Sequence, residues 1–296
     1  MEIAVEKSID YVQGAISYSY SLGKGNGPLN HVYRQRNLSF TPYFPSSSSN
    51  MYSGKFYEYL LNHPRIKPIW HDYTEHTFLT QLAKGTLPLP AFRHYLVQDY
   101  HFLTHFSRST ALGAYKSTSL DVISAAAKIM MHIKTEVQLH RKLCAEYGVP
   151  DEEMEHGQED LACVAYTRWV TDIGTREDWY GLQVAMMPCL LGYGAIARRL
   201  YDDAQTVRGG SLGSLADEDG NPYFRWIENY VADDFVEAVR VGRELLESHA
   251  VKLSPERVEE IVEIFREGSR LEALFWGMGL EYHTKTTVEL AKLNGN

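Results

Sequence analysis

Cysteine is scarce in this chain of 296 residues, which has only three. Cys144, Cys163 and Cys189 are an odd number, and no two of them form a CxxC pair. This spacing argues against a disulfide framework and against a thiolate zinc site. We therefore expect at least one free thiol.

Positive charge is also in short supply, because 29 Lys and Arg face 38 Asp and Glu, for a formal net charge of -9. No block of like charges stands out, so the chain lacks the basic patch that nucleic acid or an anionic membrane would require. No apolar run approaches the roughly 20 residues that span a bilayer, and the first residues, "MEIAVEKSID", lack the layout of a signal peptide. We expect a cytoplasmic protein with no nucleic-acid partner and no membrane partner.

Strand patterns are missing from the long region after residue 50. No segment alternates apolar and polar residues between hairpin turns, whereas apolar residues recur at helical intervals between breakers such as "YGVPDEE" and "DIGTRED". The pattern predicts an all-α fold. The expected helices cover about residues 2–19, 65–84, 89–115, 119–147, 152–172, 177–203, 222–247 and 254–291.

One segment has the composition of a linker between domains. Residues 34–50, "RQRNLSFTPYFPSSSSN", are mostly polar, carry two prolines and end in a serine run. Such a composition is typical of a flexible linker. We expect residues 1–33 and residues 51–296 to belong to different domains.

A proline next to a cysteine interrupts the most apolar helix, "LQVAMMPCLLGYGAIARRL". Proline inside a helix removes an amide donor and costs about 3 kcal/mol, so the carbonyl near Val184 loses its partner and a bend is expected at Cys189. A bend opens room beside the thiol, and Tyr193 lies one turn further on the same face. The alternative is a kinked core helix with an inert buried cysteine.

Two carboxylates stand in apolar surroundings. Asp99 has Leu96 and Phe102 on its own helical face, and Glu272 lies beside Phe275. A carboxylate in such a place is costly unless it has a partner, and burial raises its pKa toward the range useful for proton transfer. The alternative for each is an ordinary solvated or ion-paired residue.

Histidines at helical spacing raise the alternative of a metal site. His101 and His105 are one turn apart, and Glu136 and His140 repeat that spacing on another helix. Carboxylate-bridged metal sites in helical bundles use two Glu-x-x-His motifs, and neither of these pairs has that spacing. The spacing favours ordinary histidines on polar faces, and we expect no metal.

Four segments resemble, in order, the signatures of the thiaminase II (TenA) family. They read "FLTQLAKGTLPLPAFRHYLVQDYHFLTHF", "MMPCLLGYG", "YFRWIENYVADDF" and "LEALFWGMGL", and the resemblance covers about residues 51–290. It implies a haem-oxygenase-like helical bundle without haem that hydrolyses aminopyrimidines. The family also suggests a homo-oligomer, specifically a tetramer.

The same resemblance implies a role for particular residues. Cys189 matches the family's nucleophile, Glu272 its acid/base carboxylate, and Asp99 the carboxylate that hydrogen-bonds the pyrimidine. The aromatic residues at the family's substrate-binding positions are Phe102, Tyr166, Tyr193 and Tyr230. No metal or organic cofactor is implied.

A second resemblance lies at the start of the chain. The segment "AVEKSIDYVQGAISYSYSLGKGNGPLNH" resembles the closing helix and glycine-rich tail of the hydroxymethylpyrimidine phosphate kinase family, which fungal proteins fuse to a thiaminase II domain. It implies that residues 1–33 are a kinase remnant, residues 34–50 a linker and residues 51–296 the thiaminase II domain. A tail of this length neither buries a core nor forms a nucleotide site, so we expect no kinase activity.

The reaction implied is hydrolysis of 4-amino-5-aminomethyl-2-methylpyrimidine to the hydroxymethyl compound, with thiamine as a further substrate. In that reaction the Cys189 thiolate adds to the ring and expels the amine, and a nearby base must activate the thiol. The alternative is a pyrimidine- or thiamine-binding protein without catalysis. Cys189 favours an enzyme, because binding needs no thiol.

Overall fold

The structure is a computed structural model that describes residues 2–17, 55–207 and 220–294. All regular elements in these ranges are α-helices, which confirms the all-α prediction. The chain divides into two compact units, Met1–Met51 and Tyr52–Asn296. The first contains α1 (Glu2–Ser17), the counterpart of the helix predicted over residues 2–19. The expected linker, residues 34–50, lies outside the described residues.

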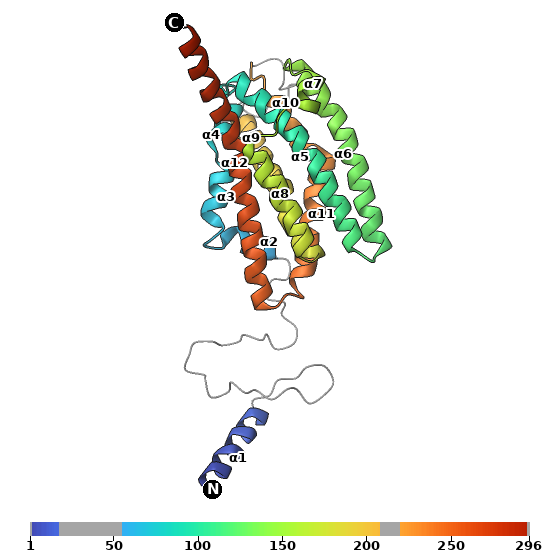
Figure 1. Cartoon of the computed structure of the whole chain (residues 1–296), viewed down its shortest axis with the longest axis vertical. Helices are drawn as coiled ribbons and strands as arrows, with labels where there is room; N and C mark the ends of the chain where they lie inside the picture. Colours follow the sequence, from blue (N-terminus) through green and yellow to red (C-terminus); the bar gives the residue numbers. More distant parts are fainter. Residues whose placement is uncertain (1, 18–54, 208–219, 295–296) are drawn as a thin grey trace. The chain divides into compact units, whose positions relative to one another are not determined.

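The second unit is a bundle of long helices that lie side by side, as Figure 1 shows. The helix α12 packs against α3, α5, α8 and α9, and the helix α6 packs along α5. The long helices are α5 (Leu89–Lys116), α6 (Leu120–Glu146), α8 (Leu161–Arg176), α9 (Trp179–Val207), α11 (Asp233–Ala250) and α12 (Pro255–Asn294). The helices α5, α6, α9 and α12 confirm four predicted helices to within a few residues.

Three other predicted helices are wrong, because each is two helices in the structure. They are α3 (Lys67–Thr74) with α4 (Thr77–Ala83), α7 (Asp151–His156) with α8, and α10 (Phe224–Val231) with α11; the sequence reasoning also missed α2 (Phe56–Asn62). The breaks are local. The side chains of His76 and Asp160 cap α4 and α8 by accepting from the backbone amides of Phe78 and Ala162. Between α10 and α11 the break is the single residue Ala232, which is extended with ψ of 151°.

Proline lies in the first turn of α3, α5 and α12 and inside α9. The helix α12 begins at Pro255, where the Ser254 hydroxyl accepts from the Arg257 amide at 3.2 Å, as the Ser-Pro pair predicts. The helix α9 continues through Pro188. A 26-residue segment of α9, Trp179–Ala204, is long and apolar enough to cross a membrane, but 72% of its most apolar window is buried inside the fold. This burial is what a core helix shows.

Aromatic rings fill the centre of the bundle. Trp276 of α12 is fully buried and contacts the rings of Tyr73, Phe78, Tyr95 and Tyr193 at centroid distances of 5.1 to 6.4 Å. These rings come from α3, α4, α5 and α9, so a single side chain joins four helices. The aromatic core therefore fixes how α12 lies against its neighbours.

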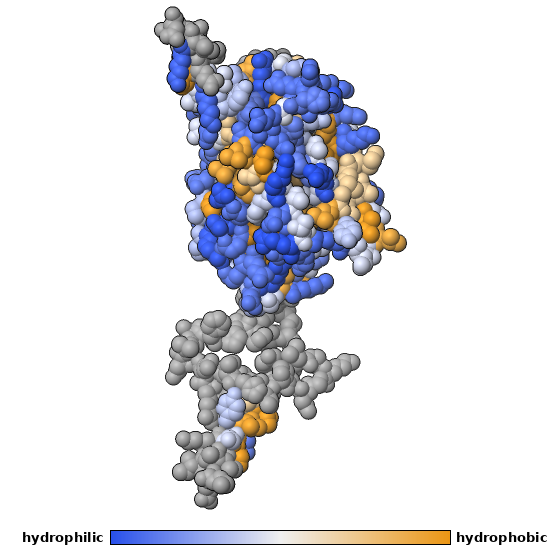
Figure 2. Space-filling view, in the orientation of Figure 1, coloured by the Kyte–Doolittle hydropathy of each residue, from blue (hydrophilic) through white to orange (hydrophobic). Residues whose placement is uncertain are grey.

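The surface is mostly hydrophilic on the face shown in Figure 2. Hydrophobic residues gather at the edge of that face where the α5–α6 hairpin lies. In this hairpin Tyr115 is 86% exposed, Leu120 78% and Met131 63%. These three apolar side chains are exposed and are not part of the buried core of the unit.

Candidate active site

The predicted site residues come from five helices of the bundle. Asp99 and Phe102 lie on α5, Tyr166 on α8, Cys189 and Tyr193 on α9, Tyr230 on α10, and Glu272 on α12. Ring contacts join them in pairs: Phe102 with Tyr166 at 5.0 Å, and Tyr193 with Tyr230 at 5.0 Å. The charges of Glu272 and Asp99 both act on Cys189. The structure therefore brings all of the predicted site residues into one region.

Glu272 is the most deeply buried carboxylate of this region, with 1% of its surface exposed. The Tyr166 hydroxyl donates a hydrogen bond to its Oε1 atom at 2.7 Å. Burial raises the pKa of Glu272 from 4.5 to about 8; the Tyr166 hydrogen bond opposes this shift, and the charge of Asp99 adds to it. The group therefore exchanges its proton close to neutral pH.

Asp99 is buried beside a histidine. Burial raises the pKa of this carboxyl from 3.8 to about 6, and the nearby His140 opposes the shift. His140 Nδ1 lies 3.6 Å from Asp99 Oδ2, while its Nε2 lies 2.8 Å from the Leu96 carbonyl oxygen. A carbonyl oxygen only accepts, so Nε2 carries a hydrogen and donates it. Sequence reasoning assigned His140 only to an alternative metal site, since nothing in the sequence indicates this pairing between helices.

Cys189 is the most exposed of the three cysteines, all of which are free. Cys144 and Cys163 are fully buried. Burial raises the pKa of the Cys189 thiol well above its usual range, and the charges of Glu272 and Asp99 raise it further. The thiol is therefore protonated in the unliganded site and needs a proton acceptor before it becomes a nucleophile.

Further aromatic side chains line this region that sequence reasoning missed. The Tyr95 hydroxyl lies 3.4 Å from the Tyr193 hydroxyl and accepts from Trp226 Nε1 at 3.3 Å. Phe275 meets the Phe102 ring edge-on at 5.7 Å. Tyr95 stands one helical turn before Asp99, and this spacing is the only feature of the sequence that indicates that Tyr95 belongs to the site. These rings give the region aromatic faces of the kind against which a flat heterocycle can stack.

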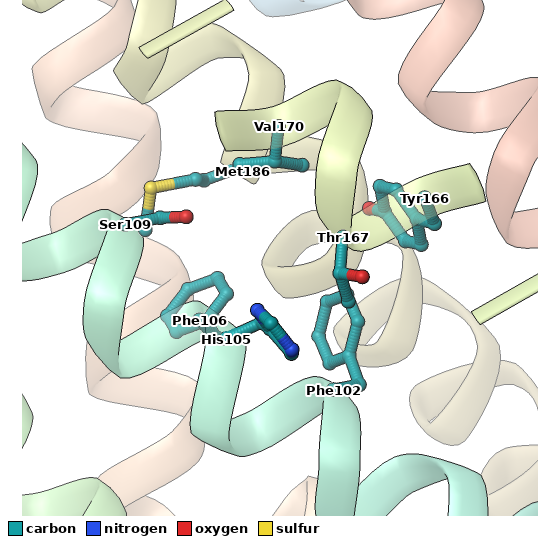
Figure 3. A pocket seen from close by; sticks show the side chains of 8 residues that line it. All are labelled: Phe102, His105, Phe106, Ser109, Tyr166, Thr167, Val170 and Met186. Atoms are coloured by element: carbon teal, nitrogen blue, oxygen red, sulfur yellow. The ribbon is translucent and has the colours of Figure 1, made fainter. Parts of the chain in front are cut away.

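A small cavity of about 10 Å³ lies next to the predicted residues. Figure 3 shows side chains of α5, Phe102 and His105, facing Tyr166 and Thr167 of α8 across it. Its volume is about that of one water-sized probe, so it is too small for a substrate. Phe102 and Tyr166 line it, and its lining includes neither the two carboxylates nor Cys189.

The histidines considered for a metal site are used otherwise. His105 lies 2.8 Å from the Arg168 guanidinium, and Glu136 pairs with His132 at 3.4 Å. Among the residues that the structure describes, no group of three or more His, Cys, Asp or Glu side chains is arranged to hold a metal ion. The alternative of a helical metalloprotein has no support in the described part of the chain.

Comparison with known proteins gives one family and relatives with two kinds of name. Residues 63–282 match the TENA/THI-4/PQQC family. The chain is 39% identical, over 97% of its length, to a Schizosaccharomyces pombe protein that carries the name of a hydroxymethylpyrimidine/phosphomethylpyrimidine kinase, and it spans 48% of that relative. It is 28% identical to the aminopyrimidine aminohydrolase of Halalkalibacterium halodurans, over 72% of this chain and 91% of the relative. The chain thus spans about half the length of the fungal relative.

Solved structures show the same fold. The crystal structure of a TenA family transcription regulator from Silicibacter sp. TM1040 has a TM-score of 0.66 and 33% identity, covering 78% of this chain and 99% of that one. Haem oxygenase-1 from Synechocystis has a TM-score of 0.54 at 15% identity, covering 81% and 98%. The fold of the helical unit is therefore haem-oxygenase-like, as predicted.

Proposed function

The chain belongs to the TENA/THI-4/PQQC family, and we propose that it hydrolyses 4-amino-5-aminomethyl-2-methylpyrimidine, and also thiamine, to 4-amino-5-hydroxymethyl-2-methylpyrimidine in thiamine salvage. One observation carries the proposal. A free, partly exposed thiol, Cys189, lies within reach of the charge of Glu272, a buried carboxylate whose pKa is about 8. A relative named aminopyrimidine aminohydrolase supports the same reaction.

Substrate binding rests on Asp99 and the surrounding rings. The Asp99 carboxylate accepts from the exocyclic amino group through one oxygen and from the protonated ring nitrogen through the other, since a buried carboxylate gains most from a charge-assisted hydrogen bond. Phe102 stacks on the pyrimidine, and Tyr193 and Tyr230 close the other side, which is consistent with the 5.0 Å contact between their rings. The pKa of about 6 leaves Asp99 ionised at neutral pH.

The first chemical step needs a proton to leave Cys189. The thiol gives its proton to the Glu272 carboxylate, and the sulfur forms a bond to a ring carbon of the pyrimidine. The electron pair pushed through the ring breaks the bond between the exocyclic methylene and its amine. Glu272 returns the proton to the departing amine, so the same carboxyl acts first as base and then as acid.

The second step restores the enzyme. Water adds to the exocyclic carbon, and Glu272 takes one of its protons. The sulfur–ring bond then breaks, the thiolate leaves, and Glu272 reprotonates it. The Tyr166 hydroxyl holds the Glu272 carboxylate in place for both steps through its 2.7 Å hydrogen bond. The reaction consumes one water and releases ammonia.

The oligomeric state, the location in the cell and the first 50 residues are also part of the proposal. We propose a cytoplasmic homo-oligomer, a tetramer by family resemblance, in which exposed apolar residues such as Leu120 and Met131 of the α5–α6 hairpin lie between copies. Residues 1–33 are proposed as the closing segment of a kinase-like domain, followed by a linker over residues 34–50. The relation to a protein named for such a kinase supports that origin.

Product analysis tests the reaction. The purified chain is incubated with the aminomethylpyrimidine and, separately, with thiamine, and the products are identified by mass spectrometry. We expect the hydroxymethylpyrimidine from the first substrate. Tight binding of either compound without any product would contradict the proposal and support the binding protein without catalysis. A stoichiometric metal in the purified protein would support the metalloprotein instead.

A further inference from the structure

The helices α9 and α12 pack together tightly at a point where a proline faces a glycine. A Cβ atom added to Gly268 of α12 would lie 2.9 Å from Cγ of Pro188. The next atoms, the Ala185 carbonyl oxygen at 3.4 Å and Trp169 Cη2 at 3.5 Å, are at ordinary contact distances. The pyrrolidine ring is therefore the single obstacle to a side chain at this position.

The two residues of this contact are neighbours in sequence of the proposed reacting groups. Pro188 directly precedes Cys189, and Gly268 stands one helical turn before Glu272, on the same face of α12. The contact between Pro188 and Gly268 therefore lies close in sequence to both the thiol and the carboxylate.

The peptide that joins Pro188 to Cys189 is also held from a third helix. The Tyr73 hydroxyl of α3 donates to the Pro188 carbonyl oxygen at 3.2 Å. The Tyr73 ring fits only because residue 192 is glycine: a Cβ there would lie 2.1 Å from Tyr73 Cε1. The Pro188 ring thus packs against α12, and the Pro188 carbonyl oxygen accepts a hydrogen bond from α3.

Helix stability does not explain these residues. Proline and glycine are the two least favourable residues in the interior of a helix, yet Pro188 and Gly268 lie inside long helices and face each other. A pair of alanines would suit both helices better. Their juxtaposition is therefore best explained by the geometry that it creates.

We propose that Pro188 and Gly268 are positioning residues whose close contact sets the spacing between Cys189 and Glu272 for proton transfer. The inference rests on the proposed function, because it takes these two groups as the reacting pair. It adds two residues that touch neither the substrate nor the reacting atoms. Pro188 sits beside the thiol to meet Gly268 rather than to widen a pocket.

The variant Gly268→Ala tests the contact. Its methyl group must push Pro188 away, and a displacement of this kind next to reacting atoms costs about tenfold to a hundredfold in kcat. We expect KM to change little and the pH profile of kcat to shift, because the carboxylate and the thiol are displaced relative to each other. The matched control is Gly277→Ala on the same helix, where an added Cβ meets nothing within 4 Å. This control should keep the wild-type kcat.

Rescue by a second substitution separates positioning from general damage. Pro188→Ala removes the ring that obstructs Ala at position 268, so the double variant Pro188→Ala/Gly268→Ala should regain most of the kcat that Gly268→Ala loses. A Gly268→Ala variant with wild-type kcat, or a double variant no better than Gly268→Ala, would overturn the proposal. If Gly268→Ala does not fold, the double variant decides: it must fold and turn over substrate.

A measurement without substrate distinguishes failure of this inference from failure of the proposed function. The rate at which iodoacetamide alkylates Cys189 is followed against pH by peptide mass spectrometry. Gly268→Ala should shift this pH dependence, and Gly277→Ala should not. If the wild-type chain converts no pyrimidine but the shift is present, the function is wrong and the contact still sets the environment of the thiol. An unshifted profile contradicts the positioning contact itself.

Discussion

The carboxylates in the centre of the helical unit differ from those at its surface in what they lie against. Glu272 and Asp99 are buried among rings, with a tyrosine hydroxyl and a histidine as their neighbours. At the surface, Glu159 meets both terminal nitrogens of the Arg168 guanidinium, at 2.8 and 3.0 Å. The arginine hydrogen bond lowers the pKa of Glu159, whereas burial raises the pKa of both central carboxyls.

The two regions therefore respond to pH in opposite directions. Between pH 4.5 and about 8 the folded state keeps a proton on Glu272 that the unfolded state has lost, so the free energy of unfolding falls as pH rises through this window. Asp99 adds the same trend between pH 3.8 and about 6. For Glu159 the stabilisation is present above pH 4.5 and is lost as pH falls through its lowered pKa. Central carboxylates that lower stability at neutral pH are candidates for chemistry.

The largest expected effect is at the thiol on which the charges of both central carboxylates act. Cys189→Ser should abolish turnover, because a serine hydroxyl of similar size is far less nucleophilic than a thiolate. Pyrimidine binding and folding should stay close to wild type. Cys144→Ser and Cys163→Ser are the controls and should remain active. Steady-state kinetics with full activity in the Cys189 variant would rule out covalent catalysis at this residue.

Glu272→Gln should separate activity from stability. Proton transfer by a positioned group contributes about a hundredfold to ten-thousandfold, so kcat should fall by that factor while KM changes less. The amide carries no charge, so the variant should have a higher free energy of unfolding than the wild type at pH 8 and above. Kinetics and urea unfolding at pH 8 measure both. A variant that is inactive because it no longer binds substrate contradicts the assignment.

Asp99→Asn should weaken binding as well as the chemical step. The substitution keeps the shape but loses the charge that pairs with the aminopyrimidine edge, and a hydrogen bond to a charged group contributes about 1.5 to 3 kcal/mol. Affinity should therefore fall about tenfold to a hundredfold by isothermal titration. The roles are refuted if Asp99→Asn binds normally and only turns over slowly while Glu272→Gln chiefly loses binding.

Glu159→Gln applies the same chemical change at the surface and should have a small effect. The exposed pair with Arg168 contributes about 0 to 1 kcal/mol, and breaking it should leave kcat unchanged. The loss should appear at neutral pH and disappear at acid pH, the reverse of the effect at Glu272. Urea unfolding at two pH values checks this. An equal loss of kcat at Glu159 and Glu272 would remove the distinction between the two regions.

Deleting residues 1–50 should have the smallest effect, because we assign them to a kinase remnant and a linker. The shortened chain should keep its kcat and its oligomeric state, measured by steady-state kinetics and by size-exclusion chromatography with light scattering. A loss of activity or of the oligomer would show that the first unit takes part in the function of the second.

Much of the helical framework is predictable from the sequence, because its starts carry local signals. Ser254 and Pro255 mark the start of α12, and the long apolar periodicity of α5 and α9 needs no tertiary information. The break at Ala232 runs against residue preference, since alanine is the best helix former and is nevertheless extended here. The break at Gly157 does have a local signal, the glycine of "HGQED" directly after α7.

The candidate site also has residues that the sequence indicates and residues that it does not. Asp99, Glu272 and Cys189 stand out in the sequence because each is polar or reactive in an apolar context. The partners of these residues do not stand out. His140 beside Asp99 and Trp226 beside Tyr95 meet only when separate helices pack, so no spacing along the chain indicates them. Sequence patterns show which groups are costly to bury, and the structure shows what surrounds them.

The pH dependence of kcat/KM is the most direct test of the central claim that Cys189 and Glu272 share one proton in the reacting state. The measurement compares wild type and Glu272→Gln on the aminomethylpyrimidine between about pH 5 and pH 10, because kcat/KM reports groups of the free enzyme. Below the pKa of Glu272 both groups hold protons, so wild-type kcat/KM should rise through about pH 8 and then level. Glu272→Gln should lose this rising limb together with most of its activity. A variant with the wild-type profile and the wild-type kcat/KM would contradict the account.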